Sequence, residues 1–246
     1  MKVIKLLGVA TLAIGILFSS VACEQKSTEE LPIAEEQNDI SLQFKDYTSD
    51  ENFNEIDENK IVETIEQYTI NDINYIIFVY ENDTNNLHSG VIIDNKIYEL
   101  QKVSMMEDKD NNDLFSVSEI ELYDKQLVKI QGILGANYAP TNYYYIENQS
   151  PQLFLHSEGH TVEVDLDNDG TQEIISTITG GVTTEIEIYK YSNGNLFVAN
   201  LNEALNAISI IYNRDNKVFE AYFKDKPNQP MFYEFTKDGL KELQSN

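Results

Sequence analysis

Hydrophobic and polar residues alternate with a period of two along most of the chain after Ile61. Residues 75–80 (Tyr-Ile-Ile-Phe-Val-Tyr) form a continuous apolar run, which predicts a buried strand. The runs 91–93 and 97–100 flank Asp94, Asn95 and Lys96, residues typical of a tight turn. This segment therefore predicts a β-hairpin.

Three later segments share one local pattern, in which an aromatic strand and an aliphatic strand flank a tight turn. They are residues 121–130, 188–198 and 232–243, and the last two contain Asn193-Gly194 and Asp238-Gly239. These dipeptides supply the positive φ that such turns require. Only residues 202–207 favour a short helix. The pattern predicts an all-β fold of antiparallel hairpins, arranged as a propeller-like array or alternatively as a β-sandwich.

The first 22 residues have the pattern of a signal peptide. Lys2 and Lys5 precede an uncharged run from Leu6 to Ala22 that ends in small residues. This run of 17 residues lies at the lower limit for a membrane span. We therefore expect a cleaved leader rather than a membrane span.

Cys23, the only cysteine, directly follows Ser20-Val21-Ala22. The segment resembles the lipobox of bacterial lipoproteins, although Ser20 stands where that family usually has Leu. The resemblance implies that Cys23 becomes the lipidated first residue of the mature protein. The alternatives are an ordinary signal peptide with a chance cysteine and an uncleaved anchor. Acyl chains on Cys23 would then hold the protein in the lipid bilayer, on the extracellular face of the bacterial cell membrane.

The chain is strongly acidic, with 42 Asp and Glu against 17 Lys and Arg and a net charge of −25. This charge disfavours binding to nucleic acid, because phosphates would be repelled. Residues 24–60 carry 12 acids and 3 bases and have few regularly spaced apolar residues. We expect residues 1–22 to be the leader and residues 23–60 an acidic tether that merges into the domain after about residue 40. Residues 61–246 would form the β domain, with a boundary between two sub-parts near residue 150.

Residues 165–173 contain the most specific chemistry in the chain. Carboxylates stand at loop positions 1, 3, 5 and 9, and glycine stands at position 6 (Asp165, Asp167, Asp169, Glu173 and Gly170). Alternating oxygen donors around a sharp bend suit a hard cation with six to eight oxygen ligands. An EF-hand is excluded, because position 12 is Ser176 and the flanking residues have the pattern of strands.

The arrangement of strand, Asp-x-Asp-x-Asp-Gly-x-x-acid and strand resembles the calcium loops of FG-GAP and VCBS-type repeats, which occur in integrin-like β-propellers. The resemblance implies that Asp165, Asp167, Asp169 and Glu173 are side-chain ligands of calcium and that Thr171 is a backbone-carbonyl ligand. The motif occurs clearly once. It therefore predicts a calcium loop rather than a complete repeat array.

The distribution of charge supports a cation at this loop. No Lys or Arg occurs between Lys129 and Lys190, whereas nine acids do: Glu147, Glu158, Glu163, Asp165, Asp167, Asp169, Glu173, Glu185 and Glu187. Four carboxylates within nine residues repel one another by several kcal/mol in total at moderate effective dielectric. A divalent cation would remove this repulsion.

Three other patterns are weaker. Asp108 to Glu119 imitates an EF-hand but has Asp113 at the glycine position, so a solvated loop is the preferred interpretation. His156 and His160 are four residues apart, but Gly159 and an extended pattern disfavour a zinc site. Residues 143–145 are three tyrosines that we expect to build the core, with stacking on sugars as the alternative.

These observations predict a membrane-anchored surface lipoprotein whose calcium-stabilised β domain acts as a non-enzymatic binding module for a protein or glycan ligand. The first alternative is an envelope glycan hydrolase or its accessory subunit, since paired carboxylates can perform glycoside hydrolysis. The second is a structural surface protein in which calcium serves only folding.

Overall fold

The computed structural model describes residues 39–49, 52–108, 111–135, 138–237 and 239–244. Within these residues nearly all regular structure is β-strand, so the predicted all-β class with antiparallel hairpins is confirmed. The described residues belong to one compact unit. The expected leader, Cys23 and the first part of the expected tether lie outside the described residues.

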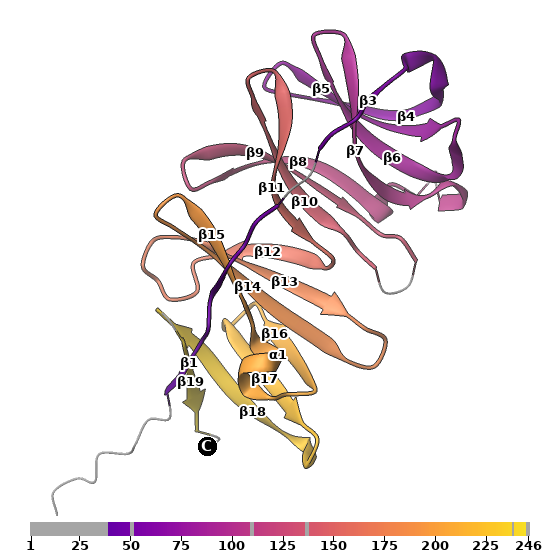
Figure 1. Ribbon diagram of the computed structural model, residues 1–246. Coiled ribbons are helices and arrows are strands. Elements are labelled where there is room, and N and C mark those ends of the chain that lie inside the picture. Colours follow the sequence, from indigo (N-terminus) through magenta and orange to yellow (C-terminus); the bar gives the residue numbers. More distant parts are fainter. Residues whose placement is uncertain (1–38, 50–51, 109–110, 136–137, 238, 245–246) are drawn as a thin grey trace, which may run out of the picture. The chain divides into compact units, whose positions relative to one another are not determined.

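The strands form four antiparallel sheets that follow one another along the chain (Figure 1). The first contains β4 (Ile61–Ile70), β5 (Ile73–Tyr80), β6 (Asp83–Ile93) and β7 (Lys96–Met105); the second contains β8 (Phe115–Leu122), β9 (Lys125–Gly132), β10 (Thr141–Glu147) and β11 (Ser150–Ser157). The third contains β12 (His160–Val164), β13 (Glu173–Thr179), β14 (Thr184–Ser192) and β15 (Asn195–Asn200); the fourth contains β16 (Ser209–Asn213), β17 (Val218–Phe223), β18 (Lys226–Thr236) and β19 (Gly239–Leu243). Each group of four is a meander of sequential strands.

Short helical segments connect some of these strands. They are α1 (Leu201–Leu205) and the 3-10 helices η1 (Glu58–Lys60), η2 (Met106–Asp108) and η3 (Asn112–Leu114). The helix α1 begins after Asn200, whose side chain accepts a hydrogen bond from the Glu203 N–H, and it ends at Asn206 in the left-handed region. The predicted helix at residues 202–207 is thus present, one residue earlier at its start.

Tight turns set the register of the hairpins. Both central residues have positive φ in the turns at Asn71-Asp72, Asp94-Asn95, Tyr123-Asp124 and Asn193-Gly194. This is the type I′ geometry, whose twist matches that of the paired strands, and Asn, Asp and Gly adopt it at low cost. The hairpins predicted at residues 91–100, 121–130, 188–198 and 232–243 are all present.

Consecutive sheets pack face to face through hydrophobic clusters. The cluster between the first and second sheets includes Ile77, Val103, Ile130 and Tyr144, and the cluster between the second and third includes Tyr143, Leu155, Ile174 and Tyr189. The cluster between the third and fourth includes Ile186, Ile188, Phe219 and Phe235. Successive residues of a strand point to opposite faces, so Tyr143 and Tyr144 enter different clusters and both are fully buried. The prediction that these tyrosines build the core is confirmed.

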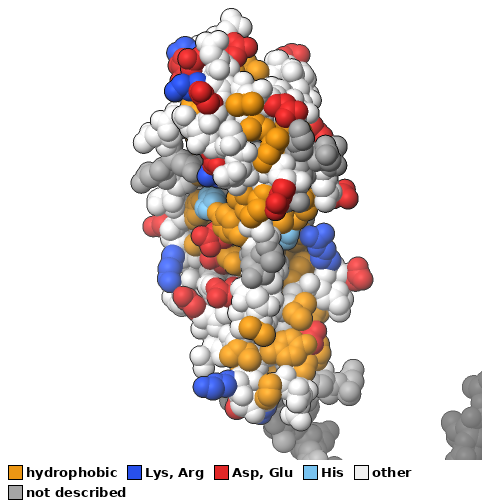
Figure 2. Space-filling model, turned by 90° about the vertical axis from the view of Figure 1, so that its right-hand side faces the viewer, with side chains coloured by type: hydrophobic (Ala, Val, Ile, Leu, Met, Phe, Trp, Pro, Cys, Tyr) orange, Lys and Arg blue, Asp and Glu red, His pale blue; other side chains and the backbone are white. Residues whose placement is uncertain are grey.

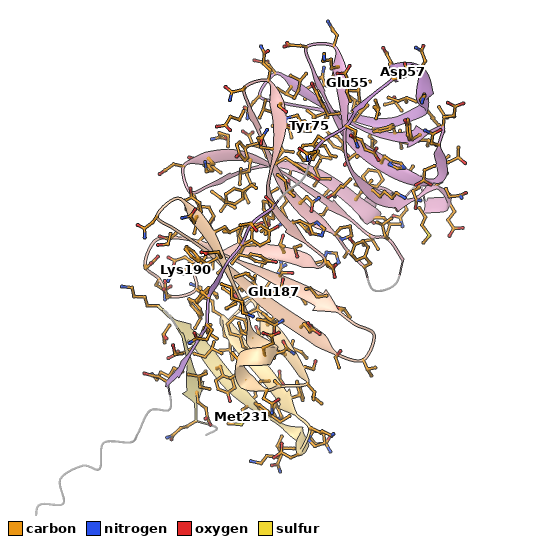
Figure 3. All side chains as sticks on the ribbon, viewed as in Figure 1. Glu55, Asp57, Tyr75, Glu187, Lys190 and Met231 are labelled. Carbon is orange, nitrogen blue, oxygen red and sulfur yellow. The ribbon has the colours of Figure 1, made fainter. Side chains whose placement is uncertain are left out.

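The segment before the first sheet, residues 39–49 and 52–56, runs along the last strands of the four sheets, and we call it the strap. Within it, β1 (Asp39–Ser41) pairs with β19, β2 (Lys45–Asp46) with β15 and β3 (Glu55–Ile56) with β7. At the second sheet, the Ser49 hydroxyl donates to the Leu153 carbonyl, 3.0 Å away. The Lys96 ammonium donates to Glu55 of the strap at 2.7 Å, and Figure 3 labels Glu55. Residues 39–49 and 52–56 therefore attach to the sheets, within the segment where we expected the tether to merge into the domain.

Four meanders packed in chain order are compatible with the predicted propeller-like array, and face-to-face packing of neighbouring sheets is also a property of a sandwich. No helix within the described residues is long and apolar enough to cross a membrane.

Candidate metal centre

Residues 165–172 form the loop between β12 and β13, and its backbone organises the acidic side chains. Asn168 and Gly170 have φ of 59° and 91°, which lets the chain coil sharply. The N–H groups of Asp169 and Gly170 each donate to the Asp165 carboxylate at 3.1 Å. The Asp169 N–H also lies 3.2 Å from Asp167 Oδ1. The side chains of Asp165 and Asp167 are thus held against the coil.

Three of the predicted side-chain ligands converge. One carboxylate oxygen from each of Asp165, Asp167 and Glu173 lies within 4.8 Å of the other two. Asp165 and Asp167 are half-buried, and Glu173, the first residue of β13, is fully buried. The strand β13 therefore fixes one ligand, and the loop presents the other two.

The Glu173 carboxylate has one oxygen bonded and one without a partner. Its Oε2 accepts a hydrogen bond from the Leu166 N–H at 2.9 Å. Its Oε1 and the Oδ2 of Asp167 are buried and accept no hydrogen bond from any described residue. Burial, aided by the charges of Asp167 and Asp169, raises the pKa of Glu173 to about 7. Buried acceptors without donors are costly, so these two oxygens lower the stability of the fold unless a proton or a cation compensates them.

Asp169 and Thr171 lie in the same loop but outside the group of three. The Thr171 N–H donates to Asp169 Oδ1 at 2.7 Å, and this bond holds the pKa of Asp169 below its ordinary value. Ser176, at the position where an EF-hand needs its bidentate Glu, is buried with its hydroxyl 2.5 Å from that of Ser157. The structure thus assembles Asp165, Asp167 and Glu173, and leaves the ligand roles of Asp169 and Thr171 as predictions.

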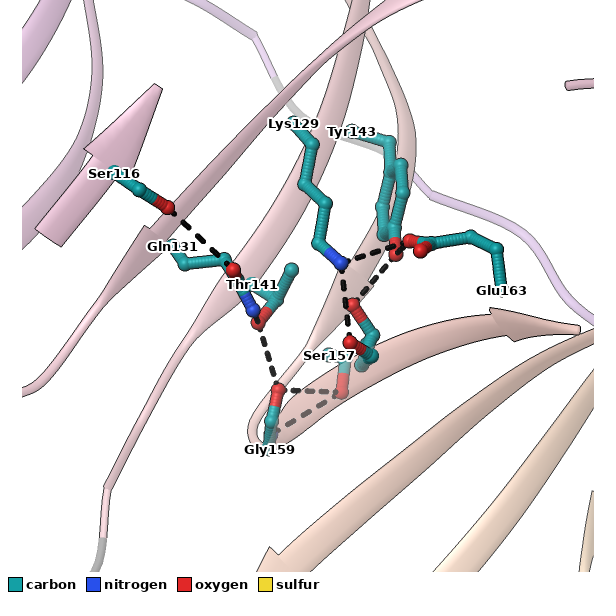
Figure 4. Close-up of polar contacts among 9 residues, drawn as sticks. Ser116, Lys129, Gln131, Thr141, Tyr143, Ser157, Gly159 and Glu163 are labelled. Atoms are coloured by element: carbon teal, nitrogen blue, oxygen red, sulfur yellow. Dashed lines mark hydrogen bonds and ion pairs between the residues drawn. The ribbon is translucent and has the colours of Figure 1, made fainter. Parts of the chain in front are cut away.

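The segment between Lys129 and Lys190, which contains no Lys or Arg, is contacted by lysines from outside it. From the turn between β16 and β17, the Lys217 ammonium donates to the Asp165 carbonyl at 2.6 Å and to Asn168 Oδ1 at 2.9 Å. The almost buried Lys129 ammonium lies 2.8 Å from Glu163 Oε1 and donates to the Thr161 carbonyl at 3.0 Å (Figure 4). Lys190 and Glu187 both lie on β14 (Figure 3). Glu163 is therefore paired, whereas no ammonium within the described residues contacts the carboxylate oxygens of Asp165, Asp167 or Glu173.

The Lys129 network belongs to the packing of the second sheet on the third. The Tyr143 hydroxyl donates to Glu163 and lies 2.5 Å from the Thr161 hydroxyl (Figure 4). Burial, with a smaller contribution from Glu163, raises the pKa of Tyr143. These groups satisfy one another in a closed network, so we assign them to fold specificity rather than to chemistry.

Two hollows flank the loop of residues 165–172, which we call the cation loop because it carries the candidate ion ligands. The larger, of about 780 Å³, lies between the loop, the β8–β9 turn and the β14–β15 turn. The smaller, of about 550 Å³, lies between the loop and the turns of the fourth sheet near Lys217 and Lys237. The three turns around the larger hollow lie at the left-hand edge in Figure 1. Figure 2 shows a side turned away from this edge, where hydrophobic side chains gather.

The weaker sequence patterns, which we did not interpret as metal sites, form no group of three metal ligands among the described residues. His156 Nδ1 lies 2.6 Å from the Asn142 side-chain oxygen, and His160 contributes to no cluster of three metal ligands. The expected loop from Asp108 to Glu119 lies partly outside the described residues, and Glu119 accepts a hydrogen bond from Asn71 at 2.7 Å. Sequence reasoning missed the stacked pair of Tyr123 and Tyr191, because their proximity depends on the packing of two sheets.

Comparison of the chain with protein-family models, with curated proteins and with solved structures gave no match.

Proposed function

We propose that the loop of residues 165–173 binds calcium and that this ion stabilises the β unit. The observation that carries the proposal is the fully buried Glu173, whose Oε1 has no partner and whose carboxylate converges with those of Asp165 and Asp167. Carboxylate oxygens are the ligands that calcium prefers, and three convergent carboxylates supply a high local negative charge. Asp169 and the carbonyl of Thr171 would complete the coordination.

Thermal unfolding of the full chain tests the calcium site. A ligand that binds only the native state raises stability by RT ln(1 + [L]/Kd), which is about 2.7 kcal/mol at one hundred times Kd. We expect the melting temperature to rise between EDTA and millimolar CaCl₂ and expect Asp167→Ala to abolish this rise. Asp215→Ala, which removes an acid from the exposed β16–β17 turn, should keep it. An unchanged calcium response in Asp167→Ala would exclude the assigned ligands.

We further propose that the protein is a lipid-anchored binding module of the bacterial cell envelope. The leader and Cys23 support the anchor, and an open hollow bordered by turns supports binding rather than catalysis. Release of the Cys23→Ser variant from the membrane fraction would support the anchor. Retention of the variant by the membrane would instead indicate an uncleaved span.

A further inference from the structure

The larger hollow beside the cation loop has walls from two sheets. The β8–β9 turn of the second sheet contributes Glu121, Tyr123 and Asp124, and the third sheet contributes Asp165 and, from the end of β14, Tyr191. Tyr123 and Asp124 have φ of 55° and 58°, so they form the tip of the turn. We call this hollow the tyrosine groove.

Two tyrosine rings form a fixed aromatic wall of the tyrosine groove. The rings of Tyr123 and Tyr191 are stacked, with centroids 4.6 Å apart and planes inclined by 19°. Phe154 lies behind them, 6.0 Å from each ring. The Tyr123 hydroxyl donates to the Gln172 carbonyl at 2.7 Å, which fixes the ring to the cation loop. Aromatic faces held in this way attract a cation that lies over them.

The charged residues that line the tyrosine groove have one sign. Glu121, Asp124 and Asp165 are among them, and the lining contains no Lys, Arg or His. The side chains of Glu121 and Asp124 are exposed and form no hydrogen bond or ion pair with other described residues. On the first sheet, by contrast, Lys96 pairs with Glu55 and Lys102 with Asp83. The groove therefore presents unneutralised negative charge beside two tyrosines.

Burial and, to a smaller extent, the charges of Glu173 and Glu163 raise the pKa of the Tyr123 phenol. A cation in the groove would thus gain from both the carboxylates and the rings, whereas an anion would be repelled by both.

We propose that the tyrosine groove binds a basic peptide segment of a partner protein and takes an arginine side chain over the tyrosine pair. Arginine is the preferred cation for aromatic stacking, and its planar guanidinium also forms paired hydrogen bonds with carboxylates. Glu121 and Asp124 are placed to receive it at the β8–β9 turn. This inference rests on the proposed binding role but not on the calcium site.

Titration of the full chain with a fluorescein-labelled peptide of alternating arginine and glycine, in 0.15 M NaCl and EDTA, tests the groove. We expect saturable 1:1 binding, and no binding of the same peptide with glutamine in place of arginine. The double variant Glu121→Gln with Asp124→Asn should weaken binding about tenfold, because it removes two of the facing charges. A matched double variant, Glu58→Gln with Glu81→Gln, removes two exposed acids near the first sheet and should stay within about twofold of the unmodified chain.

Variants of Tyr191 separate the ring from the charges. Tyr191→Phe should keep the affinity, and Tyr191→Leu should lower it, because only the former retains an aromatic face. Equal losses in the two double variants would reveal diffuse attraction to an acidic protein and would overturn the proposal. So would binding of a neutral oligosaccharide such as chitohexaose, lost in Tyr191→Leu, together with no peptide binding. Because EDTA is present, each of these outcomes is independent of the calcium response in thermal unfolding.

Discussion

The position of Glu173 depends on the local sequence, and its burial depends on the tertiary structure. Its spacing from Asp165 follows from the sequence, but its burial follows from its position at the start of β13, where the strand enters the packed sheets. A glutamate without an ion would leave a buried charge beside the Asp167 carboxylate. Such an arrangement costs stability unless a proton or a cation compensates it.

Replacement of Glu173 by glutamine should therefore have opposite effects with and without calcium. In EDTA we expect Glu173→Gln to stabilise the protein by about 1 kcal/mol, because the amide removes the buried charge and can donate to the unpartnered oxygen of Asp167. In calcium we expect the variant to be less stable than the unmodified chain, because a ligand has been lost. Thermal or urea unfolding in both buffers measures the two differences.

Glu185→Gln is the matched control, since Glu185 is an exposed acid on the neighbouring strand β14. Its stability should change by less than about 0.5 kcal/mol in both buffers. If Glu173→Gln destabilised the protein in EDTA and kept its response to calcium, the carboxylate would be a structural hydrogen-bond acceptor and not an ion ligand.

The convergence of the three carboxylates was predictable because their residues are close in sequence, whereas the surroundings of the loop were not. Alternate acids on one coil must lie near one another whatever the rest of the chain does. Lys217 and Lys129 come from other sheets, so the count of bases between residues 129 and 190 could not reveal them. The stacking of Tyr123 on Tyr191 likewise joins two sheets, so neither segment of the sequence alone predicts it.

Hairpins are the elements that the sequence predicts best, because turn chemistry is local. Asp94-Asn95 and Asn193-Gly194 adopt the positive φ that their residue types favour. The turn at Tyr123-Asp124 has the same geometry with an aromatic residue in it, and here the tertiary contacts of Tyr123 outweigh the intrinsic preference.

The strands of the strap and their pairing were not predicted, because each strand contains only two or three residues and lies in an acidic segment. Two buried hydrophobic side chains, Leu42 and Ile56, nevertheless attach it to different clusters. Strands this short show no periodicity that can be read along the chain. Their pairing depends on the strands β7, β15 and β19, each of which offers an edge to the strap.

A substitution at Leu42 tests whether the strap is part of the folded core. Leu42 is 5% exposed and packs between the third and fourth sheets, so Leu42→Ala should lower the free energy of unfolding by about 2–5 kcal/mol. The neighbouring Gln43 is exposed, and Gln43→Ala should cost less than about 0.5 kcal/mol. Equal, small effects in urea unfolding would place the strap outside the cooperative unit.

On the scale of the whole compact unit, the acidic loop is a junction of three sheets. It connects two strands of the third sheet, receives the Tyr123 hydroxyl from the second and receives the Lys217 ammonium from the fourth. Leu166 of the same loop is buried in the cluster between the third and fourth sheets. An ion that orders this loop would thus stabilise contacts on both sides of the third sheet, and part of the net charge of −25 would serve this junction.

Hydrogen exchange can measure how far the effect of calcium extends. If the loop couples the sheets, calcium should slow exchange in residues 165–173 and also in the β8–β9 turn and in residues 213–218, because local opening of either turn breaks a contact with the ordered loop. The Asn71-Asp72 turn of the first sheet makes no described contact with the loop and should exchange at the same rate with and without calcium. The variant Lys217→Met, which lacks the ammonium, should lose the effect in residues 213–218 while it keeps the effect in the β8–β9 turn. We expect this spread because a loop that shares hydrogen bonds with both neighbours, once ordered, also holds the turns that bond to it. Protection confined to the loop would instead show that calcium binds without coupling the sheets.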